Sequence, residues 1–280
     1  MSQKQRIIDA HLHFCPGASY FNEIAEAAGH QNNWVHVQEE YRRLNIVGGI
    51  VMGNRSLKPE DHVYPDVFRY CIGIDRSYLQ GSSLERAAEG LEIHLQRSQC
   101  AGIKLYPGYN PIYVYDEAYE PIYELAQKYK KPVAIHTGAT AGTGALLKYC
   151  HPLTLDEAAT KHPYVQFVMC HFGNPWLTDA AAVVDKNDNV ALDLSGLLEG
   201  PFCVEDLFRR KQGYLSQLRA WLDYLDSYED VMFGTDWPLV NLEEYIAFIR
   251  RLIPEEEHEK VFFENANRIY GMGLTGKTEE

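Results

Sequence analysis

Long apolar stretches are missing from this sequence of 280 residues. None reaches the roughly 18 apolar residues that a membrane-spanning helix needs, and Met1–Arg6 carries no apolar signal segment. Basic residues are also scarce, since 26 Lys and Arg stand against 39 Asp and Glu. The formal net charge of -13 argues against nucleic acid and membrane surfaces as partners, because both select basic patches. We expect a cytoplasmic protein whose partner is a small-molecule substrate.

Paired cysteine motifs are missing as well. The six cysteines show neither zinc-finger nor redox spacing, so in a reducing compartment they should be free thiols. They are Cys15, Cys71, Cys100, Cys150, Cys170 and Cys203. Cys170 precedes His171 at the end of an apolar run, and alternation along a strand turns it the opposite way, toward the helices. We therefore leave Cys170 out of the candidate site.

A glycine-rich phosphate loop does not follow the first apolar run, which argues against an open nucleotide-binding sheet. Asp9-Ala10-His11-Leu12-His13 stands there instead. Alternate strand residues point to one side, so His11 and His13 leave the backbone about 7 Å apart and can converge on one metal ion. A pair of surface histidines, or one core and one loop histidine, fits the repeat equally well.

Three later apolar runs each end near a residue type that binds metals. Residues 132–138 contain His136, residues 165–171 end in His171, and residues 231–236 end in Asp236. Each run is short, rich in β-branched or aromatic residues and close to Gly or Pro, as is typical of buried parallel strands. Barrel enzymes build their active sites at the carboxyl ends of such strands, so these side chains are candidates for one site.

The whole chain alternates between strand-like and helix-like segments. Eight strand-like runs occur near residues 6–12, 46–52, 68–74, 101–106, 132–137, 165–171, 189–195 and 231–236. Helical spacing separates them, for example at 119–129 and 242–252. Capping-box spacings are Ser82 with Glu85, Thr154 with Glu157, and Asn241 with Glu244. This pattern predicts an α/β fold, a (β/α)8 TIM barrel with a single domain over residues 1–271 and a frayed tail at 272–280; a doubly wound sheet is the alternative.

Six segments taken together carry a family resemblance. They are Asp-Ala-His-Leu-His at 9–13, Gly-Ile-Lys-Leu-Tyr-Pro at 102–107, Pro-Val-Ala-Ile-His-Thr-Gly at 132–138, His-Phe-Gly at 171–173, Phe-Gly-Thr-Asp-Trp-Pro at 233–238 and Glu-Asn-Ala-Asn-Arg-Ile-Tyr-Gly at 264–271. The set resembles the amidohydrolase superfamily, and within it the amidohydrolase-related (amidohydrolase 2) branch of metal-dependent hydrolases and decarboxylases. The resemblance runs from about Ile7 to Gly271, nearly the whole chain.

The resemblance implies one divalent metal ion, zinc being the usual one, with manganese or a second ion as alternatives. The implied ligands are His11, His13, His136 and Asp236. In one-metal members, the histidine at the place of His171 faces the metal's water, whereas in two-metal members it binds the second ion. Two-metal members also carry a carboxylated lysine, roughly where Lys104 stands. We expect one ion, with Lys104 in a salt bridge or a substrate-anion contact.

This ligand set suggests hydrolytic chemistry. Imidazoles and one carboxylate leave a divalent ion with an open position for water, whose pKa falls from about 15.7 to around 7. Asp236 can accept the proton as the nucleophile attacks, and His171 can polarise the substrate carbonyl or pass a proton to the leaving group. Asp9 is either a buried hydrogen-bonding residue or a support for a ligand, and Asp193 either makes a plain buried contact or orients His171.

Five residues are candidate substrate contacts: Arg55, Lys104, Tyr106, Trp176 and Trp237. Arg55 and Lys104 can each hold a carboxylate. The three aromatic residues follow predicted strands, where they either pack over the barrel rim or form a pocket wall.

The predicted function is hydrolysis of a C–O or C–N bond, as in a lactone, ester or amide, in a small carboxylated substrate by a metal-bound hydroxide. The alternative on the same scaffold is non-oxidative decarboxylation of an unsaturated or aromatic acid. A metal-binding protein without catalysis is a remote alternative. The resemblance also suggests a homodimer.

Overall fold

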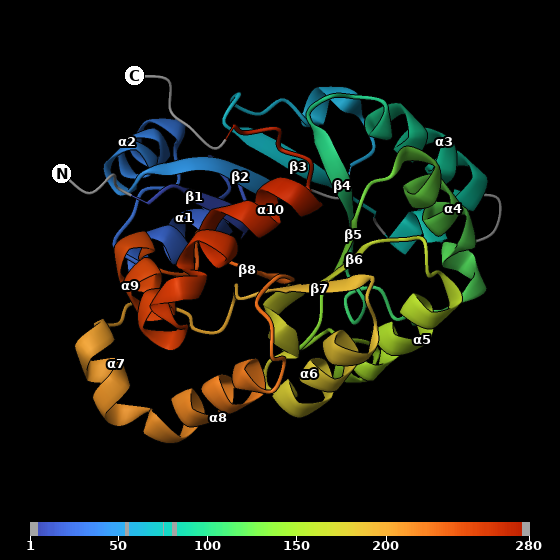
Figure 1. Cartoon of the computed structure of the whole chain (residues 1–280). Coiled ribbons are helices and arrows are strands. Elements are labelled where there is room, and N and C mark those ends of the chain that lie inside the picture. Colours follow the sequence, from blue (N-terminus) through green and yellow to red (C-terminus); the bar gives the residue numbers. More distant parts are fainter. Residues whose placement is uncertain (1–4, 54–55, 75, 80–82, 276–280) are drawn as a thin grey trace.

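Eight strands form one sheet in the computed structural model, which describes residues 5–53, 56–74, 76–79 and 83–275. The strands follow one another around the sheet in chain order, and each neighbouring pair is parallel. Helices surround the sheet on the outside (Figure 1). The predicted single-domain TIM barrel is confirmed.

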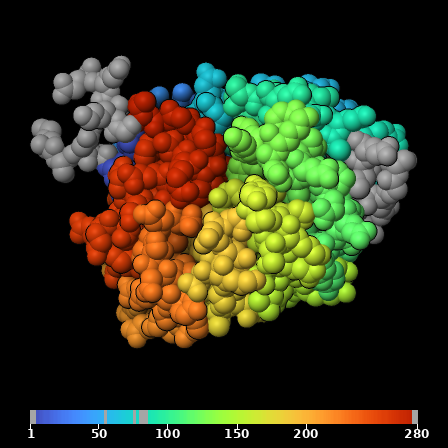
Figure 2. Space-filling model, turned by 45° about the vertical axis from the view of Figure 1, so that its right-hand side comes forward, coloured from blue at the N-terminus to red at the C-terminus, as the bar shows by residue number. Residues whose placement is uncertain are grey.

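Each strand falls in one of the eight runs that the sequence predicts, apart from Cys100, which precedes the fourth run by one residue, and the last four strands end two to four residues earlier than predicted. The strands are β1 (Ile7–Leu12), β2 (Ile46–Met52), β3 (Phe68–Gly73), β4 (Cys100–Leu105), β5 (Val133–Ile135), β6 (Phe167–Met169), β7 (Val190–Asp193) and β8 (Val231–Met232). The α-helices in the described part of the chain are α1 (Ser19–Ala27), α2 (Trp34–Leu44), α3 (Ser83–Leu95), α4 (Glu120–Tyr129), α5 (Leu153–Lys161), α6 (Leu177–Lys186), α7 (Val204–Arg210), α8 (Gln212–Asp223), α9 (Leu242–Leu252) and α10 (Asn265–Ile269). Each strand and the helices that follow it lie beside the next strand of the chain. The colours of Figure 2 therefore follow one another across the face, from red and orange through yellow to green.

Backbone hydrogen bonds close the barrel between β1 and the segment after β8. Ala10 N donates to Phe233 O at 2.9 Å, and Asp236 N donates to His11 O at 2.8 Å. The buried Asp9 carboxylate accepts from the backbone N–H and the hydroxyl of Thr235, at 2.9 and 2.5 Å. Asp9 is thus a hydrogen-bonding residue that joins β1 to β8, and the closure brings two distant motifs side by side.

Two apolar layers pack on the two sides of the sheet. Outward residues such as Ile103 pack with the surrounding helices, and inward residues such as Ala134 pack with α10 residues such as Ala266. The helix α10 therefore covers the barrel end at which the strands begin. Met272 is also buried in this inner cluster, so the packed chain extends beyond Gly271.

Helix starts agree with the predicted caps in one described case and disagree in another. Asn241 caps α9, and its side chain accepts from Glu244 N at 3.2 Å. Thr154 is not a cap, because α5 has already begun after Pro152, whose backbone is helical. Ser82 lies outside the described residues. Within those residues, no helix has the length and apolarity needed to cross a membrane.

Candidate active site

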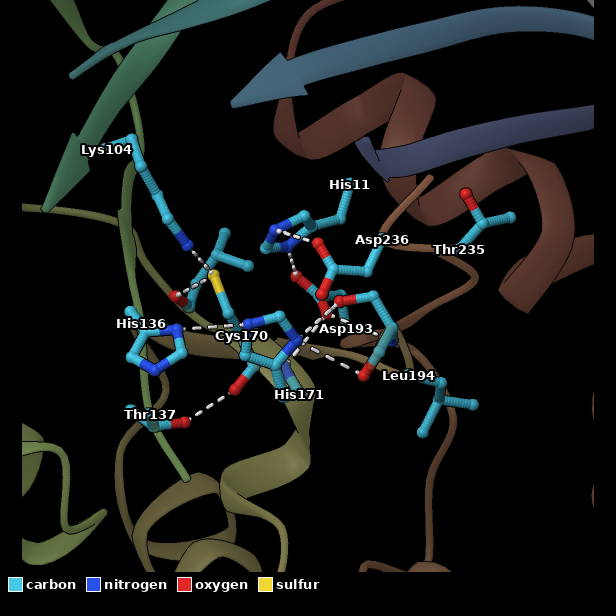
Figure 3. A network of polar contacts seen from close by, with 12 residues as sticks. His11, Lys104, His136, Thr137, Cys170, His171, Asp193, Leu194, Thr235 and Asp236 are labelled. Atoms are coloured by element: carbon cyan, nitrogen blue, oxygen red, sulfur yellow. Dashed lines mark hydrogen bonds and ion pairs between the residues drawn. The ribbon is translucent and has the colours of Figure 1, made fainter. Parts of the chain in front are cut away.

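A cavity of about 940 Å³ lies over the carboxyl ends of the strands. The predicted residues that line it are His11, His13, Lys104, Tyr106, His136, His171 and Asp236. They come from β1 and β4 and from the segments after β1, β4, β5, β6 and β8. The barrel thus brings all predicted metal ligands and both predicted catalytic residues to one hollow, part of which is drawn in Figure 3.

Three predicted ligands converge. The ligand atoms of His11, His13 and Asp236 all lie within 4.8 Å of one another. Asp236 Oδ1 is 3.1 Å from His13 Nε2 and 3.5 Å from His11 Nε2. His11 is fully buried, yet its Nε2 atom has no hydrogen-bond partner among the described residues. An unpaired buried nitrogen is costly, and a cation beside Asp236 would satisfy it.

His136 lies beside this group rather than within it. Its Nδ1 atom is 3.2 Å from His171 Nε2, and the His171 ring centroid is 4.7 Å from that of His11. The Nε2 atom of His136 is buried and has no hydrogen-bond partner among the described residues, like that of His11. Both free nitrogens are the kind of donor that zinc binds, so the residues present fit a divalent metal ion.

Backbone conformation turns His171 and Asp236 into the cavity. The strand β6 ends at Met169, and Cys170–Gly173 forms a tight turn in which His171 has φ 64°. Asp236 has φ 56°. Both values lie in the left-handed region, where Asp and His are among the more frequent non-glycine residues. Gly196 faces His171, because a Cβ atom there would lie only 2.6 Å from His171 Nδ1.

The predicted orientation of Cys170 is wrong. Val168 and Cys170 lie in the inner apolar cluster, and Phe167 and Met169 lie in the outer one. Cys170 therefore continues the alternation inward, and it is His171 that the left-handed turn redirects into the cavity. The Cys170 Sγ atom lies 2.9 Å from Lys104 Nζ, and both residues are fully buried (Figure 3).

Asp193 contacts both His11 and His171. Its Oδ2 atom is 3.0 Å from His11 Nδ1, and its Oδ1 atom accepts from His171 N at 3.0 Å. Ser195 Oγ lies 2.5 Å from Asp193 Oδ1 and 2.9 Å from His171 Nδ1. Sequence reasoning anticipated a contact with the His171 ring; the ring that Asp193 binds directly is that of His11.

Burial sets the protonation of the inner histidines. It lowers the pKa of His11 to about 4 and lowers those of His136 and His171, and the charge of Lys104 acts in the same direction. Burial opposes ionisation of Asp236, but the hydrogen bond from His13 and the electrostatic attraction to His11 and His171 in their protonated forms outweigh it, so the Asp236 pKa stays well below its usual range. Neutral imidazoles and an ionised carboxylate are the forms that bind metals.

The predicted substrate contacts separate into three groups. Lys104 and Tyr106 line the cavity, and the Tyr106 hydroxyl donates to Gly53 O at 3.2 Å. Trp176 packs beside His151 with ring centroids 4.9 Å apart, and it lies outside the cavity lining. Arg55 lies outside the described residues.

Trp237 also lies outside the cavity lining. It is fully buried against His30, with ring centroids 4.8 Å apart. Its neighbour Asp236 faces the cavity.

Aromatic and aliphatic wall residues were missed from the sequence. Phe21 on α1 lies beside His13 with ring centroids 5.9 Å apart, and Leu198 and Phe202 come from the segment after β7. Ala25 is the one buried residue of α1, so the aromatic residues of this helix are not part of the core. Nothing in residues 196–202 marks them as a wall.

Comparison with known proteins identifies the family and the fold of the chain. A family described as amidohydrolase matches residues 8–272. No curated protein matches the chain. An uncharacterised TIM-barrel protein from Bordetella bronchiseptica is 21% identical, with a TM-score of 0.69 over 95% of this chain and 99% of that one.

Some of the similar structures have named activities. A candidate 2-pyrone-4,6-dicarboxylic acid hydrolase from Pseudomonas putida is 15% identical, with a TM-score of 0.65 over 98% of this chain and all of that one (100%). The 2,6-dihydroxybenzoate decarboxylase from Rhizobium is 16% identical, with a TM-score of 0.68 over 96% and 100%. At these identities the likeness shows the fold.

Divalent metals accompany this fold in other solved structures. An amidohydrolase from Burkholderia multivorans, 16% identical with a TM-score of 0.65, has bound zinc. A 5-carboxyvanillate decarboxylase from Novosphingobium aromaticivorans, 13% identical with a TM-score of 0.62, has bound manganese.

Proposed function

The chain belongs to the amidohydrolase family, and from this premise we propose that it is a metal-dependent hydrolase acting on a C–O or C–N bond in a small carboxylated substrate. The observation that carries the proposal is the pair of unpartnered buried nitrogens, His11 Nε2 and His136 Nε2, beside the ionised Asp236. Lactones, esters and amides are the substrate types. We propose that one ion is bound and that it is zinc.

Four residues would hold the ion: His11, His13, His136 and Asp236. Bound there, a divalent ion supplies Lewis acidity, which polarises a carbonyl group and lowers the pKa of water toward about 7. His11 Nδ1 contacts Asp193 at 3.0 Å, which keeps the ring oriented.

The remaining chemistry comes from side chains that line the cavity. Asp236 accepts the proton of the attacking water at a carboxylate oxygen. His171, next to Asp236 and His11 in the hollow, carries a proton to the leaving group. Lys104 holds the substrate carboxylate, and Tyr106 forms the adjoining wall.

Decarboxylation of an aromatic acid is the second candidate. Tyr20, Phe21, Tyr106, Tyr109 and Phe202 all line the cavity, and such a wall suits a planar ring. Three of the similar structures are decarboxylases of aromatic acids. Protonation of carbon would then replace the addition of water.

Metal analysis and product analysis test the proposal together. The full chain is expressed with added zinc, and its metal content is compared with that of a His11→Gln/His13→Gln double variant. We expect close to one ion per chain in the wild type and a strong loss in the variant; equal contents would contradict the proposed site.

The product distinguishes the two reactions. A panel of lactones, esters, amides and aromatic acids, each with a carboxylate, is incubated with the loaded enzyme. Ring opening or cleavage supports hydrolysis, and release of carbon dioxide supports the second candidate. Light scattering on the same sample tests the expected homodimer.

A further inference from the structure

The two carboxylate oxygens of Asp193 contact different parts of the site. Oδ2 contacts the His11 ring directly at 3.0 Å, and Oδ1 reaches the His171 ring through the Ser195 hydroxyl. Asp193 and Ser195 are both fully buried, so no solvent competes for these bonds. Each bond has a donor and an acceptor, and the position of every proton follows from that requirement.

The first proton lies on His11. Asp193 Oδ1 accepts hydrogen bonds from His171 N, Ser195 N and the Ser195 hydroxyl, and such bonds stabilise the ionised carboxylate. An ionised carboxylate accepts only, so His11 Nδ1 carries the hydrogen. In the neutral ring, Nε2 then has a free lone pair, and this is the atom without a partner.

The second proton lies on His171. The Ser195 hydroxyl has a single hydrogen, which it donates to Asp193 Oδ1 at 2.5 Å. Its oxygen therefore accepts from His171 Nδ1 at 2.9 Å. The Ser195 carbonyl oxygen, 3.3 Å from the same nitrogen, also accepts only. Both acceptors require a hydrogen on His171 Nδ1, which leaves a lone pair on Nε2 of the neutral ring.

The third proton lies on His136. His171 Nε2 accepts from His136 Nδ1 across 3.2 Å, so His136 Nδ1 carries the hydrogen. The lone pair of the neutral His136 ring is then on Nε2, which is the second buried atom without a partner. The direct contact from Asp193 thus leaves a lone pair on His11 Nε2, and the path through Ser195 and His171 leaves one on His136 Nε2.

We propose that Asp193 is a positioning residue that sets the tautomers of His11, His171 and His136, directly and through Ser195, so that His11 presents Nε2 to a metal ion beside His13 and Asp236 while the lone pair of His136 is left on its Nε2 atom. This inference rests on the proposed metal-dependent function and deepens it. It also assigns the resting role of His171: its Nε2 atom accepts a proton before it can donate one, so His171 is a proton shuttle and not a donor to the substrate carbonyl at the start of the reaction.

Nuclear magnetic resonance of histidine side chains tests the proposal directly. The full chain, labelled with 15N-histidine, is measured with bound zinc and again after chelation, and His11→Gln and His171→Gln variants assign the signals. We expect the Nδ1–H tautomer for His11, His171 and His136 in the chelated protein, and for His11 with zinc bound. A hydrogen on Nε2 of any of the three rings in the chelated protein overturns the proposal.

Asp193→Asn is the decisive variant. The Oδ1 position must stay an acceptor, because His171 N, Ser195 N and the Ser195 hydroxyl all donate to it. The new NH2 group therefore faces His11 Nδ1 and donates, which moves the His11 hydrogen to Nε2. We expect the His11 signals to switch tautomer and zinc affinity to fall about 10–100-fold. Asp206→Asn, at an exposed residue of α7, is the control and should change neither.

The outcomes separate the two proposals. If the His11 tautomer is unchanged in Asp193→Asn, the proposed role of Asp193 is overturned, even if the enzyme is a hydrolase. If the expected tautomers are observed but no substrate is turned over, the proposed role of Asp193 stands and the result counts against the proposed function. If the variant does not fold, the wild-type signals decide by themselves.

Discussion

Lys104 and Cys170 meet inside the barrel, with Lys104 Nζ 2.9 Å from Cys170 Sγ. Both residues are fully buried, and Lys104 also lines the cavity. Burial raises the pKa of the Cys170 thiol, so this partner carries no charge at neutral pH. A thiol is a weak acceptor, and a buried ammonium group gains more from an anion. The pair thus leaves the charge of Lys104 available to a substrate carboxylate.

Replacing Lys104 by Met keeps the length of the side chain and removes its charge. We expect KM for a carboxylated substrate to rise about 10–100-fold, which corresponds to losing a hydrogen bond to a charged group worth about 1.5–3 kcal/mol. KM for the methyl ester of the same substrate should change little, and this analogue serves as the control. Metal content should also stay the same; loss of part of it would favour the two-ion alternative, in which Lys104 takes part in metal binding.

Asp236→Asn tests the proton acceptor. Asn tolerates the left-handed backbone that this position requires, with φ 56°, so the loop should keep its shape. The amide keeps an oxygen for the metal but does not accept a proton, and turnover should fall about 10²–10⁴-fold. Metal analysis of the same sample is the control. Near-normal turnover with full metal content would remove Asp236 from this role.

His171→Asn separates a shuttle from a ligand. Asn suits φ 64° at this position better than a longer side chain does. If His171 moves protons and does not bind the ion, turnover should drop by about 10²–10⁴-fold while metal content stays close to that of the wild type. A variant that loses its metal would instead identify His171 as a ligand and favour two ions.

His30, which lies outside the cavity lining, makes the folding stability depend on pH. Its Nε2 atom accepts from Leu242 N, at the start of α9, at 3.1 Å, and its Nδ1 atom lies 2.8 Å from His36 Nε2. Burial, with the charge of His36, lowers the pKa of His30 from 6.5 to about 4; the nearby Glu40 opposes this shift and Arg43 adds to it. Between these values the unfolded chain binds more protons than the folded one, so stability falls as the pH falls from 6.5 toward 4.

His30→Gln should weaken this pH dependence. The Gln oxygen accepts from Leu242 N without titrating. One pKa unit corresponds to about 1.4 kcal/mol, so between pH 6.5 and pH 4 His30 should lower the free energy of unfolding of the wild type by on the order of 3 kcal/mol. The decrease in the variant should be smaller by that amount. Urea unfolding at several pH values measures this, with His151→Gln as the control. Parallel curves for wild type and His30→Gln would contradict the prediction.

Much of the site could be predicted because its residues stand at strand ends. His11, His136 and Asp236 each follow an apolar run, and parallel strands bring their carboxyl ends to one side whatever the details of packing. Alternation along a strand then predicts which side chains share a face, and it succeeded for His11 and His13, which both line the cavity. It failed for Cys170, because its orientation was inferred from that of His171, which a left-handed turn redirects, whereas Cys170 itself continues the alternation from Val168.

The sequence alone thus determined the barrel, the positions of its strands and the set of residues with metal-binding chemistry, because these depend on local apolar periodicity and on residue type. The tertiary structure decided which partners those residues meet. Asp193 bonds to His11 across 182 positions of the chain, Lys104 reaches Cys170 across 66, and Trp237 turns away from the cavity to pack on His30. Such contacts depend on strand ends, left-handed turns and side-chain packing, which are set only when the barrel closes.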